Sequence, residues 1–228
     1  MSKAELIVAL DVPNAAAMEK KLEEMPDFID WYKVGLELFC AEGPAVLEPL
    51  RKRNKKIFLD LKLHDIPRTV GNAVKTAAEH GVNLMTVHAI GGRAMLEEAA
   101  RAARACANPP RIVAVTTLTS LSQDDFTDLG IGRTVAEQAL ELGRLAISSG
   151  IDGMVTSAHE ASVLREAFPE AILVTPGIRM PEGDVGDQKR VATPSYAVEQ
   201  GATHLVIGRP IVQADDPAAA ATAMLNDM

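Results

Sequence analysis

The sequence is 228 residues long, with 47% hydrophobic and 4% aromatic residues, so it can bury one full core packed mainly by aliphatic side chains. Its formal net charge of -8 and its isoelectric point near 5.2 argue against nucleic acid or an anionic membrane as a partner, but a small anionic ligand needs only a few local cations. The two cysteines, Cys40 and Cys106, lack metal-binding or redox spacing, which indicates a reducing compartment without disulfide bonds.

The first residues, MSKAELIVALDVP, contain an apolar run that is about one strand long. They lack the basic region and the longer apolar stretch of a signal peptide. No segment reaches the ~20 apolar residues that a membrane helix needs. We therefore expect a cytoplasmic protein without a membrane partner.

Short apolar runs alternate with helical patterns along the whole chain. The runs cover residues 5–11, 30–35, 55–62, 83–89, 111–117, 152–158, 171–177 and 203–208. Helical patterns follow them, for example over about 14–25, up to about Arg53, and in the alanine-rich segments 92–107 and 133–150. Parallel strands need such crossovers, and eight units in this length predict a (β/α)8 TIM barrel with its active site at the C-terminal face of the strands.

The sequence predicts a single TIM-barrel catalytic domain over residues 1–228. A doubly wound open sheet is the alternative, although the first strand–helix turn, LDVPNAAAM, lacks the glycine fingerprint of its dinucleotide-binding version. Gly81, Gly150 and Gly201 follow helical segments, where glycine caps are expected. The connections over about 120–133 and 176–194 are longer than their neighbours, as expected for substrate-binding loops and lids.

Charged residues fall at the ends of the first three predicted strands. Asp11 ends the first strand, Lys33 lies in the second, and Asp60 and Lys62 end the third. Side chains two residues apart in a strand share a face, so Asp60 and Lys62 should point together into the barrel mouth. A surface ion pair, worth ~0 to 1 kcal/mol, is the simpler interpretation. Matching charges on neighbouring strands instead favour a site in which a charged lysine between aspartates donates a proton.

The histidines do not form an obvious site. His88 ends the fourth strand, and no second histidine or acid accompanies it at metal spacing, so we expect a packed, hydrogen-bonded side chain. His64 lies between Leu63 and Asp65 and receives no chemical role. We predict neither a metal site nor a Ser-His-Asp triad.

A phosphate site is predicted at the other side of the barrel mouth. Gly208 and Arg209 follow the eighth strand directly, and barrels often bind phosphate after strands seven and eight. Glycine allows a close backbone N–H, and arginine supplies a forked donor. The predicted lid that faces them carries Arg179, Gln188, Lys189 and Arg190. In VTTLTS, residues 115–120, hydroxyls either read the amide edge of a heterocycle or serve ordinary strand and cap chemistry.

The motif DLKLHDIPRT resembles the D-x-K-x-x-D-I-P-x-T signature of bacterial-type, single-function orotidine 5′-monophosphate decarboxylases. The resemblance extends over essentially the whole chain and includes ALDVP, YKVGLELF, VHAIGG, VTTLTS, TPGIRMPEGDVGDQKR and LVIGRPI. It implies release of carbon dioxide from C6 of orotidine monophosphate to give UMP, the last step of de novo UMP synthesis, without metal or organic cofactor.

The resemblance also implies roles for individual residues. Lys62 would protonate C6, Asp60 would face the substrate carboxylate, and Asp65 would arrive from the partner subunit of a homodimer to complete an array with Lys33. The implied substrate contacts are Asp11, Lys33, Asp60, Ile66 and, across the interface, Thr69. Thr119 would read the pyrimidine edge, and the phosphate contacts would be Arg179, Gln188, Gly208 and Arg209.

Two alternatives remain open at the level of the sequence. One is a magnesium-dependent sugar-phosphate lyase or aldolase of the same barrel group, in which the acids hold the metal. Lys33 opposes it, because an ammonium there suits a metal-free site. The other is a non-catalytic nucleotide-binding barrel, which would keep the phosphate elements without needing Lys62 as an acid.

Overall fold

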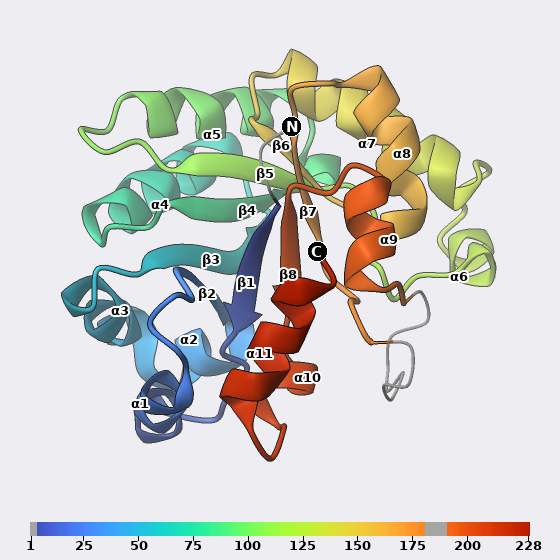
Figure 1. Ribbon diagram of the computed structural model, residues 1–228. Helices are drawn as coiled ribbons and strands as arrows, with labels where there is room; N and C mark the ends of the chain where they lie inside the picture. Colours follow the sequence, from blue (N-terminus) through green and yellow to red (C-terminus); the bar gives the residue numbers. More distant parts are fainter. Residues whose placement is uncertain (1–3, 181–190) are drawn as a thin grey trace.

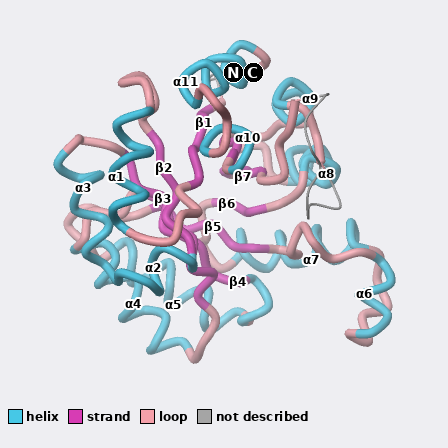
Figure 2. The backbone as a smooth tube through the Cα atoms, turned by 90° about the horizontal axis from the view of Figure 1, so that it is seen from below, coloured by secondary structure: helices cyan, strands magenta, loops and turns pink. Residues whose placement is uncertain are grey.

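A computed structural model describes residues 4–180 and 191–228 of the chain. Its strands form a closed parallel barrel in the order β1 to β8, with β8 pairing back onto β1. Figure 1 shows the strands at the centre of the molecule, and the view from below in Figure 2 shows the helices around them. The predicted TIM barrel is therefore confirmed, and the doubly wound alternative is wrong because an open sheet has no pairing between its first and last strands.

The strands occupy the predicted apolar runs, with shorter bounds at several ends. They are β1 Glu5–Ala9, β2 Trp31–Gly35, β3 Lys56–Leu63, β4 Leu84–His88, β5 Arg111–Val115, β6 Gly153–Val155, β7 Ile172–Thr175 and β8 His204–Ile207. Most of their residues are buried, as expected for strands that pack on both faces in a parallel barrel.

The helices of the outer layer connect successive strands. Those before β5 are α1 Ala15–Glu24, α2 Leu36–Glu42, η1 Gly43–Leu47, α3 Glu48–Lys52, α4 Pro67–Glu79, η2 Ala89–Gly91 and α5 Arg93–Arg104. Those after it are α6 Gln123–Asp128, α7 Val135–Ser148, α8 Ala158–Ala167, α9 Pro194–Glu199, α10 Arg209–Val212 and α11 Pro217–Asn226.

Two connections differ from a simple strand–helix alternation. The helical segment expected up to Arg53 is interrupted at Gly43, which has a φ of 68° and is followed by a proline. Such a backbone favours glycine and ends a helix. The predicted loop over 120–133 contains the short helix α6, which Ser122 and Asp125 begin with a reciprocal capping box.

The core has an inner and an outer part. The inner part fills the barrel and includes Ile7, Trp31, Phe58, Leu84, Val113 and Val206. The outer part lies between strands and helices and contains the alternate strand residues, such as Val8, Val34 and Leu59. Polar residues that replace an inner apolar side chain near the carboxyl ends of the strands therefore face the barrel mouth.

The glycine caps expected after three helices are confirmed by their backbone angles. The φ angles of Gly81, Gly150 and Gly201 are 76°, 83° and 96°. These left-handed conformations turn the chain from the helix into the next strand with no penalty from a Cβ atom.

Candidate active site

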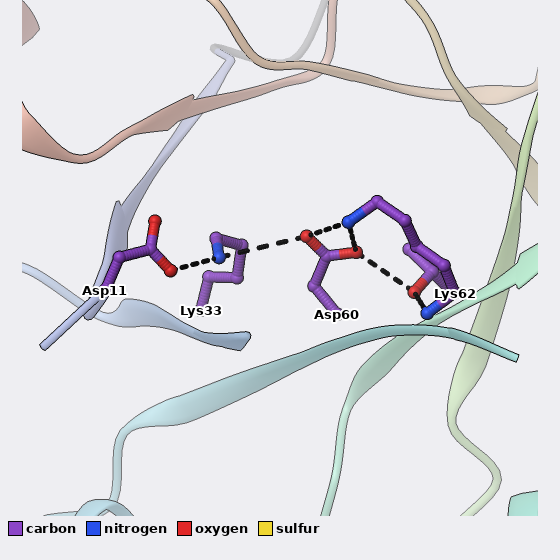
Figure 3. A network of polar contacts seen from close by, with 5 residues as sticks. Asp11, Lys33, Asp60 and Lys62 are labelled. Carbon is purple, nitrogen blue, oxygen red and sulfur yellow. Dashed lines mark hydrogen bonds and ion pairs between the residues drawn. The ribbon is translucent and has the colours of Figure 1, made fainter. Parts of the chain in front are cut away.

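Acids and lysines alternate in a row at the barrel mouth, as Figure 3 shows for Asp11, Lys33, Asp60 and Lys62. The Nζ atom of Lys33 lies 2.8 Å from Oδ1 of Asp11 and 3.8 Å from Oδ2 of Asp60. The Nζ atom of Lys62 donates to both carboxylate oxygens of Asp60, at 2.9 and 3.0 Å. The sequence-based expectation that these four charges meet at one site is confirmed.

The strand register explains why the charges converge. Lys33 pairs with Ala9 of β1, so that Asp11, two residues further on, lies above Lys33 at the mouth. Gly35 pairs with Asp60 across β2 and β3. A Cβ atom on Gly35 would lie 2.7 Å from Nζ of Lys33 and 3.0 Å from Oδ1 of Asp11. The bare backbone of Gly35 therefore makes room for the ion pair, a role that the YKVG motif alone did not reveal.

Lys62 departs from regular strand geometry. Its φ of 51° lies in the left-handed region, which is rare for a residue with a side chain. The pairing between β3 and β4 moves from Leu59–Met85 to Leu63–Val87, so four steps along β3 accompany two along β4. The side chains of Lys62 and Asp60 do meet, as predicted. They meet because of a bulge in β3, and not because of the regular strand alternation that we expected.

Thr86 of β4 fills the gap that the bulge creates. Its side chain is fully buried, its Oγ1 accepts a hydrogen bond from the backbone N–H of Lys62 at 2.8 Å, and its hydroxyl donates to Oδ1 of Asp60 at 3.1 Å. Nothing in the sequence pointed to this residue, because one threonine in an apolar strand is ordinary strand chemistry.

The row lies along a cavity of about 810 Å³ at the mouth, a size typical of small-molecule sites. Its polar side includes Asp11, Lys33, Asp60 and Lys62. The apolar lining comes from the inner core, with Ala9, Phe58, Val115, Val155, Val174 and Val206. The cavity thus combines an ionic row with apolar side chains that exclude water from one side of it.

The predicted phosphate and base contacts line the same cavity. Gly208 and Arg209 follow β8, Arg179 follows β7, and Thr119 follows β5, and all four border the cavity. Arg179 is buried, and its Nη1 donates to the carbonyl of Ile178 at 2.7 Å. Gln188, Lys189 and Arg190 of the predicted lid lie outside the described residues.

Three predicted site residues lie away from the cavity of their own chain. Asp65, Ile66 and Thr69 are exposed, and none of them lines the cavity within residues 4–180 and 191–228. Oδ1 of Asp65 accepts a hydrogen bond from the N–H of Ile66 at 2.7 Å instead of contacting a lysine. The Ile66 residue itself is 66% exposed. A single chain therefore does not complete the predicted four-residue array of Lys33, Asp60, Lys62 and Asp65.

His64 and His88 stack beside the bulge, with ring centroids 5.5 Å apart. Burial, together with His64 and Lys62, lowers the pKa of His88. The buried Nδ1 of His88 has no hydrogen-bond partner in the described part of the chain, so the hydrogen bond expected for this residue is not found at that nitrogen. The stacked pair was not predicted, because His64 follows β3 and His88 ends β4, and their rings meet only once the two strands are paired.

Within the ranges that the structure describes, no group of three or more His, Cys, Asp and Glu side chains is arranged to hold a metal ion. None of the described helices is both long and apolar enough to cross a membrane.

The closed barrel and the ionic row define a (β/α)8 protein with a row of paired acids and lysines at the carboxyl ends of its strands. Residues 4–224 match the model of the orotidine 5′-phosphate decarboxylase / HUMPS family. The chain belongs to this family, and the resemblance seen in its motifs is confirmed together with the enzyme class, a carboxy-lyase.

Similar proteins cover almost the full chain. A relative from Moorella thermoacetica, named orotidine 5′-phosphate decarboxylase, is 47% identical over 100% of this chain and 93% of its own length. A relative of the same name from Halorhodospira halophila is 47% identical over 98% of this chain and 95% of its own. The crystal structure of the orotidine 5′-phosphate decarboxylase from Lactobacillus acidophilus aligns with a TM-score of 0.87 at 40% identity and covers 98% of both chains.

Proposed function

We propose that this protein decarboxylates orotidine 5′-monophosphate to UMP and carbon dioxide, the last step of de novo UMP synthesis. The observation that carries the proposal is the alternating row of Asp11, Lys33, Asp60 and Lys62 in a member of this family. The cavity beside the row has the volume of a small-molecule site.

Lys62 is the proton donor in this proposal. The bond between C6 and the carboxylate breaks, its electron pair stays on C6, and carbon dioxide leaves. The Lys62 ammonium stabilises the developing charge and transfers a proton to C6, and the resulting amine regains a proton from water. Asp60 holds the ammonium at 2.9 Å and faces the substrate carboxylate, and Lys33 ties Asp60 to Asp11.

The other predicted site residues bind the nucleotide, together with Asp11 and Lys33 of the row. Arg209 and the Gly208 backbone bind the phosphate with Arg179 and Gln188, and Thr119 reads the pyrimidine edge. Asp11 and Lys33 contact the ribose. Because the phosphate contacts follow β7 and β8 while Lys62 lies in β3, substrate binding and proton transfer use different parts of the mouth.

The site is completed by a second copy of the chain. Asp65, Ile66 and Thr69 do not line the cavity of their own chain, and Ile66, which follows β3, and Ile90, which follows β4, are more than half exposed, at 66% and 55%. In a symmetric dimer these residues reach the partner's site, where Asp65 joins the lysines.

The chemistry needs no metal in this proposal. A magnesium-dependent lyase of the same barrel group would use the carboxylates as ligands, but the Lys33 ammonium lies 2.8 Å from Asp11 and 3.8 Å from Asp60. A cation in that position repels a divalent ion. Location in the cytoplasm stays a prediction from the sequence.

The direct test follows the absorbance change of orotidine monophosphate with purified, chelator-treated protein. Stoichiometric loss of substrate with formation of UMP supports the proposal. Activity that the chelator abolishes and magnesium restores would favour the metal-dependent lyase, and tight UMP binding without turnover would favour the non-catalytic barrel.

Shared sites are tested by mixing Asp65→Ala chains with Lys62→Ala chains. Each parent dimer lacks one group at both sites, whereas a hybrid dimer has one intact site. Random reassociation should therefore recover about a quarter of the native activity. No recovery in a preparation with proven hybrids would count against a shared site.

A further inference from the structure

Thr86 of β4 contacts both members of the Asp60–Lys62 pair, which lies on the neighbouring strand β3. It lies in the middle of β4 with no exposed surface, two residues after Leu84, which belongs to the inner core. The residues on either side, Met85 and Val87, belong to the outer core. The Thr86 side chain therefore points into the barrel, directly beneath the bulge of β3.

Both hydrogen-bonding functions of the Thr86 hydroxyl are used by the proposed machinery. The oxygen accepts from the backbone N–H of Lys62 at 2.8 Å, and the proton is donated to Oδ1 of Asp60 at 3.1 Å. The same Oδ1 atom accepts from Nζ of Lys62 at 2.9 Å. One buried hydroxyl thus touches the backbone of the proton donor and the carboxylate that holds its ammonium.

The backbone contact matters because Lys62 has an unfavourable conformation. A φ of 51° persists in a residue with a side chain only where its surroundings hold it there. The shifted pairing between Leu59–Met85 and Leu63–Val87 interrupts the ladder at Lys62, and its N–H turns to the side chain of Thr86. Removing the hydroxyl would leave that partly buried N–H without this acceptor.

We propose that Thr86 is a positioning residue that fixes the Lys62 backbone and the Asp60 carboxylate in the geometry required for proton transfer. The proposal rests on the proposed function, since it assigns Thr86 a role in the same reaction. It requires a hydroxyl at position 86 and not simply a side chain of the right volume, because a valine would fill the space without making either hydrogen bond.

The test compares Thr86→Val with Thr86→Ser. The valine variant should lower kcat by about 10- to 100-fold, as expected when reacting groups shift by a fraction of an ångström. Its KM and its affinity for UMP should change by less than about threefold, because the phosphate contacts follow β7 and β8. The serine variant should stay within about fivefold of native kcat, since it keeps the hydroxyl.

Thr116→Val is the matched control. Thr116, which directly follows β5, is also a buried threonine, at 2% exposed, and its hydroxyl donates to the carbonyl of Val155 at 3.2 Å and not to Asp60 or Lys62. The Thr116→Val variant should lose a similar hydrogen bond and keep the native kcat. If Thr86→Val does not fold, Thr86→Ala removes the same hydroxyl with less crowding and is compared with serine in the same way.

A second readout does not depend on turnover. Hydrogen exchange at the Lys62 backbone amide, followed by NMR, should be slow in native protein and in Thr86→Ser, and at least tenfold faster in Thr86→Val. A native protein that leaves orotidine monophosphate unchanged would overturn the proposed function, and the exchange result would still report on the Thr86 contact. Native kcat in Thr86→Val, equal losses in valine and serine variants, or unchanged exchange would each overturn the positioning role.

Discussion

Replacing Lys62 by alanine tests the central chemical step. In the structure, Nζ of Lys62 lies 2.9 Å from Oδ1 of Asp60, and we take a similar separation for a carbanion at C6 of a bound substrate. At an effective dielectric constant of ~20, two unit charges at that distance attract by roughly 5 to 6 kcal/mol. The Lys62 side chain is 32% exposed, and water screens part of this attraction.

After screening, about half of this attraction, ~3 kcal/mol, stabilises the carbanion in the transition state. That energy corresponds to a rate factor of about a hundred. The variant also loses its positioned proton donor, which removes a further factor of ~10²–10⁴. We expect kcat of Lys62→Ala to fall by about 10⁴ to 10⁶, while its affinity for UMP stays close to native because the substitution leaves the proposed phosphate contacts in place.

The assay is loss of orotidine monophosphate absorbance, with UMP binding measured on the same preparation. Lys52→Ala is the control, because this lysine is 73% exposed and its ion pair with Glu48 is 3.9 Å long. It should keep native kcat. A folded Lys62→Ala protein that binds UMP and turns over within tenfold of native would refute the assignment of Lys62 as the proton donor.

Two further predictions concern the ion pair and the base of the barrel. Gly35→Ala places a Cβ atom 2.7 Å from Nζ of Lys33 and 3.0 Å from Oδ1 of Asp11, so kcat/KM should fall by about 10- to 100-fold as the pair is displaced. Burial lowers the pKa of His204, which stacks edge-on against Trp31, to about 4. The unfolded chain binds this proton near pH 6.5, so the free energy of unfolding should fall by up to about 3 kcal/mol between pH 6.5 and 4, and His204→Phe should remove that part of the decline.

Each of these variants has a matched control in the same chain. Gly132 has no heavy atom within 4 Å of an added Cβ, and Gly132→Ala should leave kcat/KM unchanged. A native kcat/KM for Gly35→Ala would contradict the prediction, because it would mean that displacing the Lys33–Asp11 pair does not affect the reaction. His159 is exposed, and His159→Phe should keep the native pH profile in urea unfolding followed by circular dichroism. An unaltered profile in His204→Phe would show that other groups cause the acid sensitivity.

The barrel and most of its charged row followed from local patterns. Apolar runs of strand length separated by helices leave few alternatives in a chain of this size, and parallel pairing then brings all carboxyl ends to one face. Lys33 and Asp60 meet because Gly35 pairs with Asp60, and that register follows from consecutive strands with similar crossovers. The helix interruption at Gly43 was not predicted, because the alanine- and leucine-rich pattern continues on both sides of this glycine.

The geometry at Lys62 could not be predicted, although the meeting of its side chain with Asp60 was. Strand alternation assumes an unbroken ladder, and the register of a bulge depends on the neighbouring strand as well as its own sequence. Thr86 lies 26 residues from Asp60, and its hydroxyl becomes informative only when β3 and β4 are side by side. Asp65 was assigned through the resemblance alone, since alternation could not place it with Asp60 and Lys62.

The distribution of charge explains how an acidic protein accommodates an anionic nucleotide. The chain carries a net charge of -8, yet the described residues that line the cavity include four cations against three acids. The cations are Lys33, Lys62, Arg179 and Arg209, and the acids are Asp11, Glu37 and Asp60. Lys33 and Lys62 are paired with acids on the β1–β3 side, and the two arginines follow β7 and β8. In the proposed function, the arginines on this side of the mouth bind the phosphate, while the Asp60–Lys62 pair acts at C6.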